Sequence, residues 1–181
     1  EDVLILAGTG NNGGDALVAA RFLSKVADVE TVLLGRSSRI RTQEARENWE
    51  VLGSSEANVV EVSDSAALDG VGFDVDVVVD GMLGVGVSGA LREPVASAVE
   101  RTNRSDGYVV SADVPTGVDP DASEPSGDHV NADAVVAFHD EKPVHGELGA
   151  DVVVADIGIP DAAERVVGPG DLSLLNRAPA A

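Results

Sequence analysis

The sequence predicts an α/β fold of three layers, in which helices cover both faces of a mostly parallel central sheet. Short runs rich in Val, Leu and Ile recur without the polar and apolar alternation of a half-exposed sheet, so these strands are expected to be buried on both faces. Segments of helical character separate the runs, which is typical of βαβ units with right-handed crossovers. The predicted strands are residues 2–6, 30–34, 58–62, 74–79, 108–112, 134–138 and 151–155.

Helices are expected at residues 14–27, 41–52 and 92–104, where apolar residues recur at helical spacing. Pro94 lies near the start of the third, where its missing N–H group costs little. The segment 120–131 is dense in Asp, Ser, Pro and Gly and predicts a loop.

The composition excludes several classes of protein. The chain has 181 residues, enough for one domain, and its 32 acidic against 12 basic residues give a net charge of -20, which would repel nucleic acid. No apolar run approaches the about 18 residues that span a bilayer, and the first residues do not form a signal peptide, so we expect a cytoplasmic protein with no membrane partner. The absence of cysteine excludes disulfides and thiolate metal sites. The scarcity of lysine, with many carboxylates, resembles proteins of salt-loving organisms.

A glycine-rich segment follows the first predicted strand. Residues 7–15 read Ala-Gly-Thr-Gly-Asn-Asn-Gly-Gly-Asp. The four glycines are expected to let the backbone turn with positive φ and approach a ligand closely, and the N–H groups at the following helix start favour an anion such as phosphate. The alternative is a tight strand-to-helix turn with the Asn residues in the left-handed conformation.

Two further polar segments follow the fourth and fifth predicted strands. Asp80 precedes a second glycine-rich stretch, and Asp113 and Thr116 follow the fifth strand. Because parallel strands end at the same edge of a sheet, the three segments are expected to form one site, although Asp80 could instead be a helix cap or turn residue. Oxygen atoms of Asn12, Asp80 and Thr116 would suit a hard cation rather than zinc or copper.

The third helix is expected to begin with a salt bridge between Arg92 and Glu93 rather than with a substrate contact.

These segments resemble the NAD(P)H-hydrate epimerase family, also known as the YjeF N-terminal domain family. The Gly-Asn-Asn-Gly-Gly-Asp run is the family's most specific signature, and the block 80–94 with its final Arg-Glu-Pro and the run Asp-Val-Pro-Thr-Gly-Val-Asp at 113–119 follow in the family's order. The later runs Ala-Asp at 132–133, Lys-Pro at 142–143 and Asp-Ile-Gly-Ile-Pro at 156–160 look like further family markers.

The resemblance implies a Rossmann-like fold, a homodimer, a bound potassium ion, and equilibration of the R and S forms of hydrated NADH and NADPH, called NADHX and NADPHX. The dinucleotide-hydrate site that it implies comprises Asn11, Asn12, Gly13, Gly14, Asp15, Gly84, Val85, Gly86, Val87, Ser88, Gly89, Ala90 and Asp113. The implied potassium ligands are Asn12, Asp80 and Thr116.

The chain departs from the family pattern in a few places. Thr116 stands where the family more often has Ser, and Ala16 replaces a usual Gly. The family pattern also has a helix before the first strand, and the resemblance leads us to expect that this chain lacks it. We expect residues 1–167 to form the domain and 168–181 to be a linker toward a possible dehydratase domain dependent on ADP or ATP, which follows in the bifunctional members of the family.

Asp113 is the candidate catalytic residue. The hydrate carries a hydroxyl beside the ring nitrogen, so a general acid that protonates it, and then deprotonates a returning water, would interconvert the epimers through a planar iminium. His139 and His145 are alternative acid–base groups, or else solvated loop residues.

Two other functions compete with the epimerase. One is a non-catalytic scaffold or nucleotide-binding module. The other is an NAD(P) dehydrogenase, but Gly35 and Arg36 stand at the end of the second strand, where such an enzyme would have a ribose-binding acid.

Overall fold

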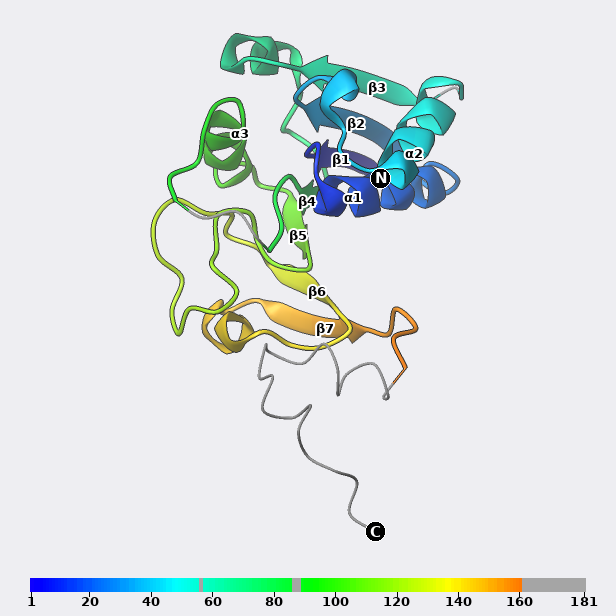
Figure 1. Cartoon of the computed structure of the whole chain (residues 1–181). Coiled ribbons are helices and arrows are strands. Elements are labelled where there is room, and N and C mark those ends of the chain that lie inside the picture. Colours follow the sequence, from blue (N-terminus) through cyan, green and yellow to red (C-terminus); the bar gives the residue numbers. More distant parts are fainter. Residues whose placement is uncertain (56, 86–88, 161–181) are drawn as a thin grey trace.

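The computed structural model describes residues 1–55, 57–85 and 89–160, which form a parallel sheet covered by helices (Figure 1). The sheet has seven strands in the order β3-β2-β1-β4-β5-β6-β7, and every neighbouring pair is parallel. The strands are β1 (Asp2–Ala7), β2 (Asp28–Leu34), β3 (Asn58–Val62), β4 (Val77–Gly81), β5 (Tyr108–Ala112), β6 (Ala134–Phe138) and β7 (Asp151–Ala155). The Rossmann-like α/β fold that the sequence predicts is therefore confirmed.

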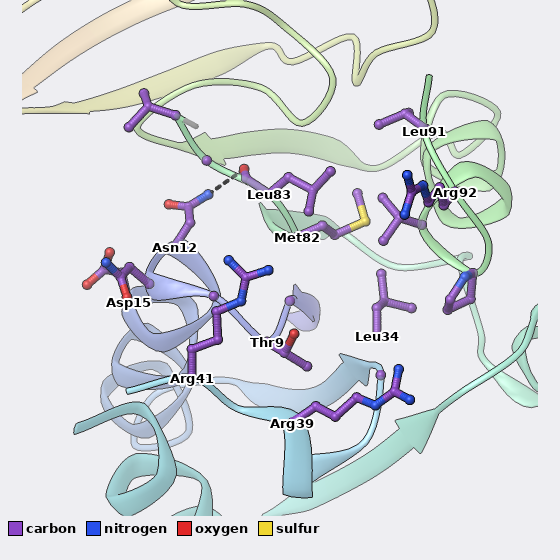
Figure 2. Close-up of a pocket in the computed structure, with 18 of the residues that line it drawn as sticks. Thr9, Asn12, Asp15, Leu34, Arg39, Arg41, Met82, Leu83, Leu91 and Arg92 are labelled. Carbon is purple, nitrogen blue, oxygen red and sulfur yellow. Dashed lines mark hydrogen bonds between the residues drawn. The ribbon is translucent and has the colours of Figure 1, made fainter. Parts of the chain in front are cut away.

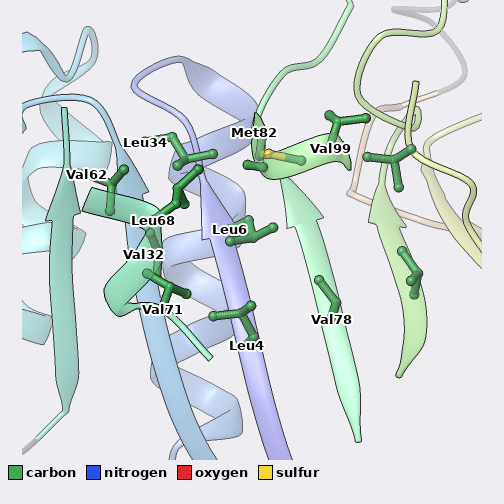
Figure 3. Close-up of a cluster of buried hydrophobic side chains, with 13 residues drawn as sticks. Leu4, Leu6, Val32, Leu34, Val62, Leu68, Val71, Val78, Met82 and Val99 are labelled. Carbon is green, nitrogen blue, oxygen red and sulfur yellow. The ribbon is translucent and has the colours of Figure 1, made fainter. Parts of the chain in front are cut away.

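Helices cover the two faces of the sheet, because β1 and its neighbours are apolar on both sides. Val3 and Ile5 of β1 pack under α1 (Asn11–Leu23) and α2 (Gln43–Gly53). Leu4 and Leu6 point to the other face, where they pack in a cluster with residues of α3 (Val95–Thr102) and the 3₁₀ helix η2 (Ser65–Gly70) (Figure 3). This double burial explains why the strands lack a polar alternation.

All seven predicted strands are present, while the helices differ at their ends. The third helix begins only at Val95, because Pro94 is its N-cap. The segment 120–131 contains no helix or strand, as expected. The 3₁₀ helices η1 (Ser37–Arg39), η2 and η3 (Pro143–Glu147) have no counterpart in the prediction, because such short elements leave no periodic pattern.

The glycine-rich segment differs from its prediction. Helix α1 starts at Asn11, so both Asn residues of the segment are helical rather than left-handed, and none of its four glycines has a positive φ. These glycines instead permit close packing. A Cβ atom on Gly13 would lie 1.8 Å from the Gly8 carbonyl oxygen, and one on Gly8 would lie 1.8 Å from the Met82 carbonyl oxygen. The ends of β1 and β4 therefore meet the start of α1 without intervening side chains.

The sheet order places a crevice beside β1. Its two neighbours are β2 and β4, and the chain winds away from β1 in opposite directions on the two sides, which is where ligands bind in open α/β sheets. In the part of the chain that the structure describes, no helix has the length and apolarity needed to cross a bilayer. The predicted linker 168–181 lies outside the described residues.

Candidate active site

A cavity of about 1330 Å³ opens at the carboxyl ends of the central strands (Figure 2). Its walls come from the glycine-rich segment after β1, from residues 34–41 at the end of β2, from the segment after β4, and from Asp113 after β5. Phe138, the last residue of β6, closes one side. The volume exceeds the roughly 300–1,000 Å³ of sites for drug-sized ligands, and would hold a dinucleotide.

Unpaired amides lie at the start of α1, where Asn11 and Asn12 line this cavity. The N-cap residue Gly10 has no side chain to accept from them, and the first amide bonded within the helix is that of Gly14, which donates to the Gly10 carbonyl at 3.1 Å. The preceding amides, those of residues 11–13, have no acceptor among the described residues. Such a helix start, together with its dipole, favours a phosphate.

Asp80 lies below the cavity floor and is fully buried. Its carboxylate accepts hydrogen bonds from the Ser111 hydroxyl (2.9 Å), the Thr116 amide (2.8 Å), the Thr116 hydroxyl (2.6 Å) and the Met82 amide (3.1 Å). Burial raises the pKa of Asp80 above its ordinary value, and these hydrogen bonds oppose the rise. The bond from Met82 shows that Asp80 also serves as a turn residue, the alternative considered from the sequence.

The backbone of Leu83 links the three expected potassium ligands. Its amide donates to the Thr116 hydroxyl at 3.0 Å, and its carbonyl accepts from the Asn12 side-chain amide at 2.8 Å (Figure 2). Because the Thr116 hydroxyl has a single hydrogen, it donates to Asp80 at 2.6 Å rather than to the Leu83 carbonyl at 3.4 Å. Asn12, Asp80 and Thr116 are thus brought together, although they come from three separate strand ends.

This cluster has the chemistry of a site for a hard monovalent cation. The Asp80 carboxylate has no ion-pair partner among the described residues, and the Thr116 hydroxyl and the Asn12 side-chain amide meet at the same backbone segment, Leu83. The described residues contain no group of three or more His, Cys, Asp or Glu side chains that could hold a metal ion. A single carboxylate with hydroxyl and amide oxygens is a donor set that suits a monovalent cation such as potassium.

Asp113 faces the cavity from the centre of a tight turn. Its φ is 67°, and the Val114 amide donates to the Ala112 carbonyl across it at 2.9 Å, as in a γ-turn. One carboxylate oxygen, Oδ1, accepts from the Phe138 amide at 3.0 Å and from the ammonium group of Lys142. Both donors reach the same oxygen, which leaves Oδ2 without a hydrogen-bond donor among the described residues.

Lys142 is held in place on the far side of Asp113. Its ammonium group also donates to the carbonyls of Phe138 (3.0 Å) and Asp140 (3.2 Å), and its side chain is 21% exposed, against 13% for Asp113. The three acceptors fix the direction of the ammonium group. The sequence marked Lys142 only as part of a family run, and no spacing rule indicated that it would meet Asp113.

His145 is neither an acid–base group of the cavity nor a solvated loop residue, in contrast to both expectations. It is 2% exposed, its Nε2 bonds to the Asp113 carbonyl at 2.9 Å, and its Nδ1 accepts from the Lys142 amide at 3.1 Å. These partners assign the ring hydrogen to Nε2. His145 therefore supports the turn at Asp113. His139 is partly exposed and does not line the cavity.

Asp15 brings a second carboxylate toward Asp113. Its pKa is raised, first by partial burial and then by the negative charge of Asp113. The two carboxylates thus influence each other across the wall of the cavity.

The structure places most of the expected substrate residues on the cavity wall. Those that line it are Asn11, Asn12, Asp15, Gly84, Val85, Gly89, Ala90 and Asp113. Gly13 and Gly14 do not line it, because they pack against Gly8 and Ala45 inside the fold. Gly86, Val87 and Ser88 lie outside the described residues.

The sequence reading missed the arginines of the cavity. Arg36, Arg39, Arg41 and Arg92 all line it. The expected salt bridge between Arg92 and Glu93 is wrong within the described residues, since Glu93 Oε2 instead accepts from the Ser97 amide at 3.3 Å. Arg36 at the end of β2 is the local signal in the sequence, where by itself it argues only against a dehydrogenase.

Comparisons with known proteins agree with this arrangement. A family profile described as "YjeF-related protein N-terminus" matches residues 1–144. The chain is 42% identical over 169 residues to a protein of Cenarchaeum symbiosum named NAD(P)H-hydrate epimerase, covering 91% of this chain and 78% of that protein. It is 48% identical over 177 residues to a protein of Methanopyrus kandleri named bifunctional NAD(P)H-hydrate repair enzyme Nnr, covering 94% of this chain but 35% of that protein.

The fold also matches a solved structure. That structure is titled "Crystal structure of yeast ynu0, YNL200c", and the match has a TM-score of 0.78 and 27% sequence identity over 93% of this chain and 71% of the yeast chain. The chain spans about a third of the length of the bifunctional relatives that it matches.

Proposed function

Because this chain belongs to the family of YjeF-related protein N-termini, we propose that it interconverts the R and S forms of NADHX and NADPHX, as an isomerase in nicotinamide nucleotide repair. The observation that supports this most is the Asp113 carboxylate, which is held through Oδ1 by Phe138 and Lys142 and belongs to a residue that lines a dinucleotide-sized cavity. The similar proteins named NAD(P)H-hydrate epimerase support the same reaction.

In this proposal Asp113 transfers the proton. A protonated Oδ2 gives its hydrogen to the ring hydroxyl, the C–O bond breaks with its electron pair leaving as water, and the ring nitrogen lone pair forms a planar iminium. Water then adds to either face of the iminium carbon, and its surplus proton returns to Oδ2. Lys142 acts as a positioning residue, since its ammonium group holds Oδ1 and compensates the carboxylate charge that forms when Asp113 has given up the proton.

The phosphates would bind where the chain offers donors. The unpaired amides at the start of α1 face the diphosphate, and Arg41 lies beside Thr9 on the same wall (Figure 2). The hydrated nicotinamide ring would then extend toward Asp113.

Asp80, Thr116 and Asn12 would hold a potassium ion under the cavity floor. The ion would neutralise the buried Asp80 carboxylate and stabilise the packing of the strand ends. All steps of proton transfer remain with Asp113.

Several expectations stay predictions: the homodimer, the cytoplasmic location, the salt-adapted origin of the net charge, and a dehydratase domain after this one. A non-catalytic scaffold is not favoured, because the cavity keeps the paired Asp113 and Lys142 and the relatives are named epimerases.

The test is an epimerisation assay with a matched control. A sample enriched in one NADHX epimer is followed by chromatography as it returns to equilibrium, with the wild-type chain, Asp113→Asn or Asp119→Asn. Asp119 is an exposed carboxylate six residues later that does not line the cavity. We expect the wild type and Asp119→Asn to accelerate the return and Asp113→Asn to lose the acceleration by about 10²-fold or more. Equal rates with and without the wild-type protein would exclude the epimerase.

A further inference from the structure

Four arginines concentrate in the cavity of a strongly acidic chain. Arg36, Arg39 and Arg41 lie at and after the end of β2, and Arg92 lies at the approach to α3. The whole chain has only 12 basic residues against 32 acidic ones. A third of its positive charges thus lines one concave surface, which points to an anionic ligand with more than one charged group.

Acidic side chains of the cavity do not neutralise these arginines. Asp15, Glu93 and Asp113 also line it, but Asp113 pairs with Lys142 and Glu93 accepts a backbone amide at the start of α3. Within the described ranges, none of the four guanidinium groups has an ion-pair partner. Their hydrogen-bond donors are therefore available to a ligand.

The position of Arg36 and Arg39 indicates which group they bind. In open α/β sheets of this order, the adenosine ribose of a dinucleotide lies at the end of the strand next to the glycine-rich segment, here β2. An acidic residue there binds the ribose 2′-hydroxyl, whereas an arginine accommodates a 2′-phosphate. The residues from Gly35 to Arg41 are Gly-Arg-Ser-Ser-Arg-Ile-Arg, with no acid among them.

The segment that carries these arginines is anchored at several points. The Gly35 amide donates to the Val62 carbonyl of β3 at 2.8 Å, the Ser37 amide donates to Glu61 Oε2 at 3.1 Å, and Ile40 is buried. The Arg41 amide donates to the Thr9 carbonyl at 3.0 Å, which ties the segment to the glycine-rich wall. In Figure 2 the Arg39 side chain lies near Leu34, further from Asn12 than Arg41 does. An anchored backbone limits the ordering cost of binding.

We propose, on the basis of the proposed function, that Arg36 and Arg39 bind the 2′-phosphate of the adenosine ribose, so that NADPHX is the preferred substrate over NADHX. Arg41, on the side of Asn12, contacts the diphosphate that both substrates share. The preference then resides in a ligand group far from the reacting ring.

Binding of two substrate fragments tests this independently of turnover. Isothermal titration calorimetry compares 2′-phospho-ADP-ribose with ADP-ribose, which differ only in the 2′-phosphate. Loss of two charge-assisted contacts corresponds to about tenfold or more in affinity, so we expect the wild type to bind the phosphorylated fragment at least that much more tightly. In the double variant Arg36→Ala/Arg39→Ala the two affinities become equal.

The control removes the same charge elsewhere. Arg21 and Arg104 are exposed and lie outside the cavity, so Arg21→Ala/Arg104→Ala changes the net charge equally and is expected to keep the wild-type ratio. The ratio of kcat/KM for NADPHX and NADHX should follow the binding ratio in each protein.

Two results would overturn the 2′-phosphate site: equal affinity of the wild type for both fragments, or a preference that survives in Arg36→Ala/Arg39→Ala. Either result leaves epimerisation by the wild type intact and so counts against this inference alone. A binding preference without any epimerisation would instead contradict the proposed function. Asp113→Asn, expected to lose turnover, should keep the binding preference.

Discussion

Lys142 donates a hydrogen bond from its ammonium group to the Asp113 carboxylate, although the two lie 29 positions apart in the sequence. The pair joins the turn after β5 to the segment after β6, and His145 fixes the same two residues from below by bonding to the Asp113 carbonyl and the Lys142 amide. One carboxylate oxygen is thus occupied and the other is left for chemistry.

Replacing Lys142 with methionine should reduce turnover while preserving the cavity. Without the ammonium group, Oδ1 loses one of its two donors and the carboxylate can rotate, so we expect epimerisation to fall by about 10²-fold, within the range for disturbed general acid–base groups. The loss should appear in kcat rather than in KM, because Lys142 does not line the cavity. Rates are measured by chromatography of the epimers.

Lys25, the only other lysine of the chain, provides the control. It is exposed beyond the end of α1 and lies over the Phe22 ring. Lys25→Met should leave both kcat and KM unchanged; a wild-type kcat in Lys142→Met would remove Lys142 from the positioning of Asp113.

Potassium should stabilise the fold through Asp80. The pKa of Asp80 is raised by burial, so in the absence of a cation its ionisation costs stability, and this cost grows as the pH rises above the ordinary value of 3.8. Binding of an ion that is present at ten to a hundred times its Kd would add about 1–3 kcal/mol to the free energy of unfolding. Thermal unfolding in potassium chloride and in tetramethylammonium chloride of equal ionic strength measures the difference.

Two variants separate this site from general salt effects. Asp80→Asn should lose the difference between the two salts, whereas Thr116→Ser keeps the hydroxyl that donates to Asp80 and should retain it. Equal melting temperatures of the wild type in both salts would speak against a potassium site, because screening of the net charge depends on ionic strength alone.

A methyl group at Gly13 should destabilise the protein far more than one at Gly10. The added Cβ would lie 1.8 Å from the Gly8 carbonyl oxygen, which is backbone and cannot rotate away, so we expect Gly13→Ala to lower the free energy of unfolding by about 3 kcal/mol. At Gly10 nothing lies within 4 Å, and loss of a glycine N-cap should cost less than about 1 kcal/mol. Urea denaturation monitored by circular dichroism compares the two, and similar losses would refute the packing role of Gly13.

Replacing Asp15 with asparagine should raise stability slightly at neutral pH. The pKa of Asp15 is raised by partial burial and by Asp113, so the ionised group is less favourable in the folded than in the unfolded chain, and this penalty appears as the pH rises above 3.8. The gain in the free energy of unfolding should be about 0.5 kcal/mol, since the Asp15 residue is exposed to water.

Below pH 3.8 Asp15 is protonated in both the folded and the unfolded wild-type chain. The wild type and Asp15→Asn should therefore have the same urea midpoint at that pH. An advantage of Asp15→Asn that persists at that pH would mean that its cause is not ionisation.

The strands and the polar strand ends could be predicted because their patterns are local. Continuous apolar runs such as those of β1 and β2 result from burial on both faces, and a carboxylate directly after such a run lies at the sheet edge. The conformation of the glycine-rich segment could not be predicted in this way. A glycine can be required either by a positive φ or by close packing. Which of the two applies at Gly8 and Gly13 depends on the backbone atoms that surround them in the fold.

The hydrogen-bond partners of Asp113 could likewise not be predicted from local sequence patterns. Lys142 and His145 reach Asp113 through a one-turn 3₁₀ helix that follows β6, and the direction of that turn depends on packing of Val144 in a small core with Val114. The arginines after β2 carried a local signal, but their meaning depends on the cavity that they share with Asp113.

The order of the sheet also sets a length. From β2 to β5 the strands run β2-β1-β4-β5, and three spacings of about 4.8 Å place the two outer strand ends about 14 Å apart. A molecule that contacts both Asp113 and Arg36 has to reach across these strand ends, and a dinucleotide is long enough to do so. The strand order therefore sets the length that a ligand needs to contact both ends of the site. A substrate shortened to its nicotinamide half should lose every contact made at β2, while its reacting ring stays unchanged.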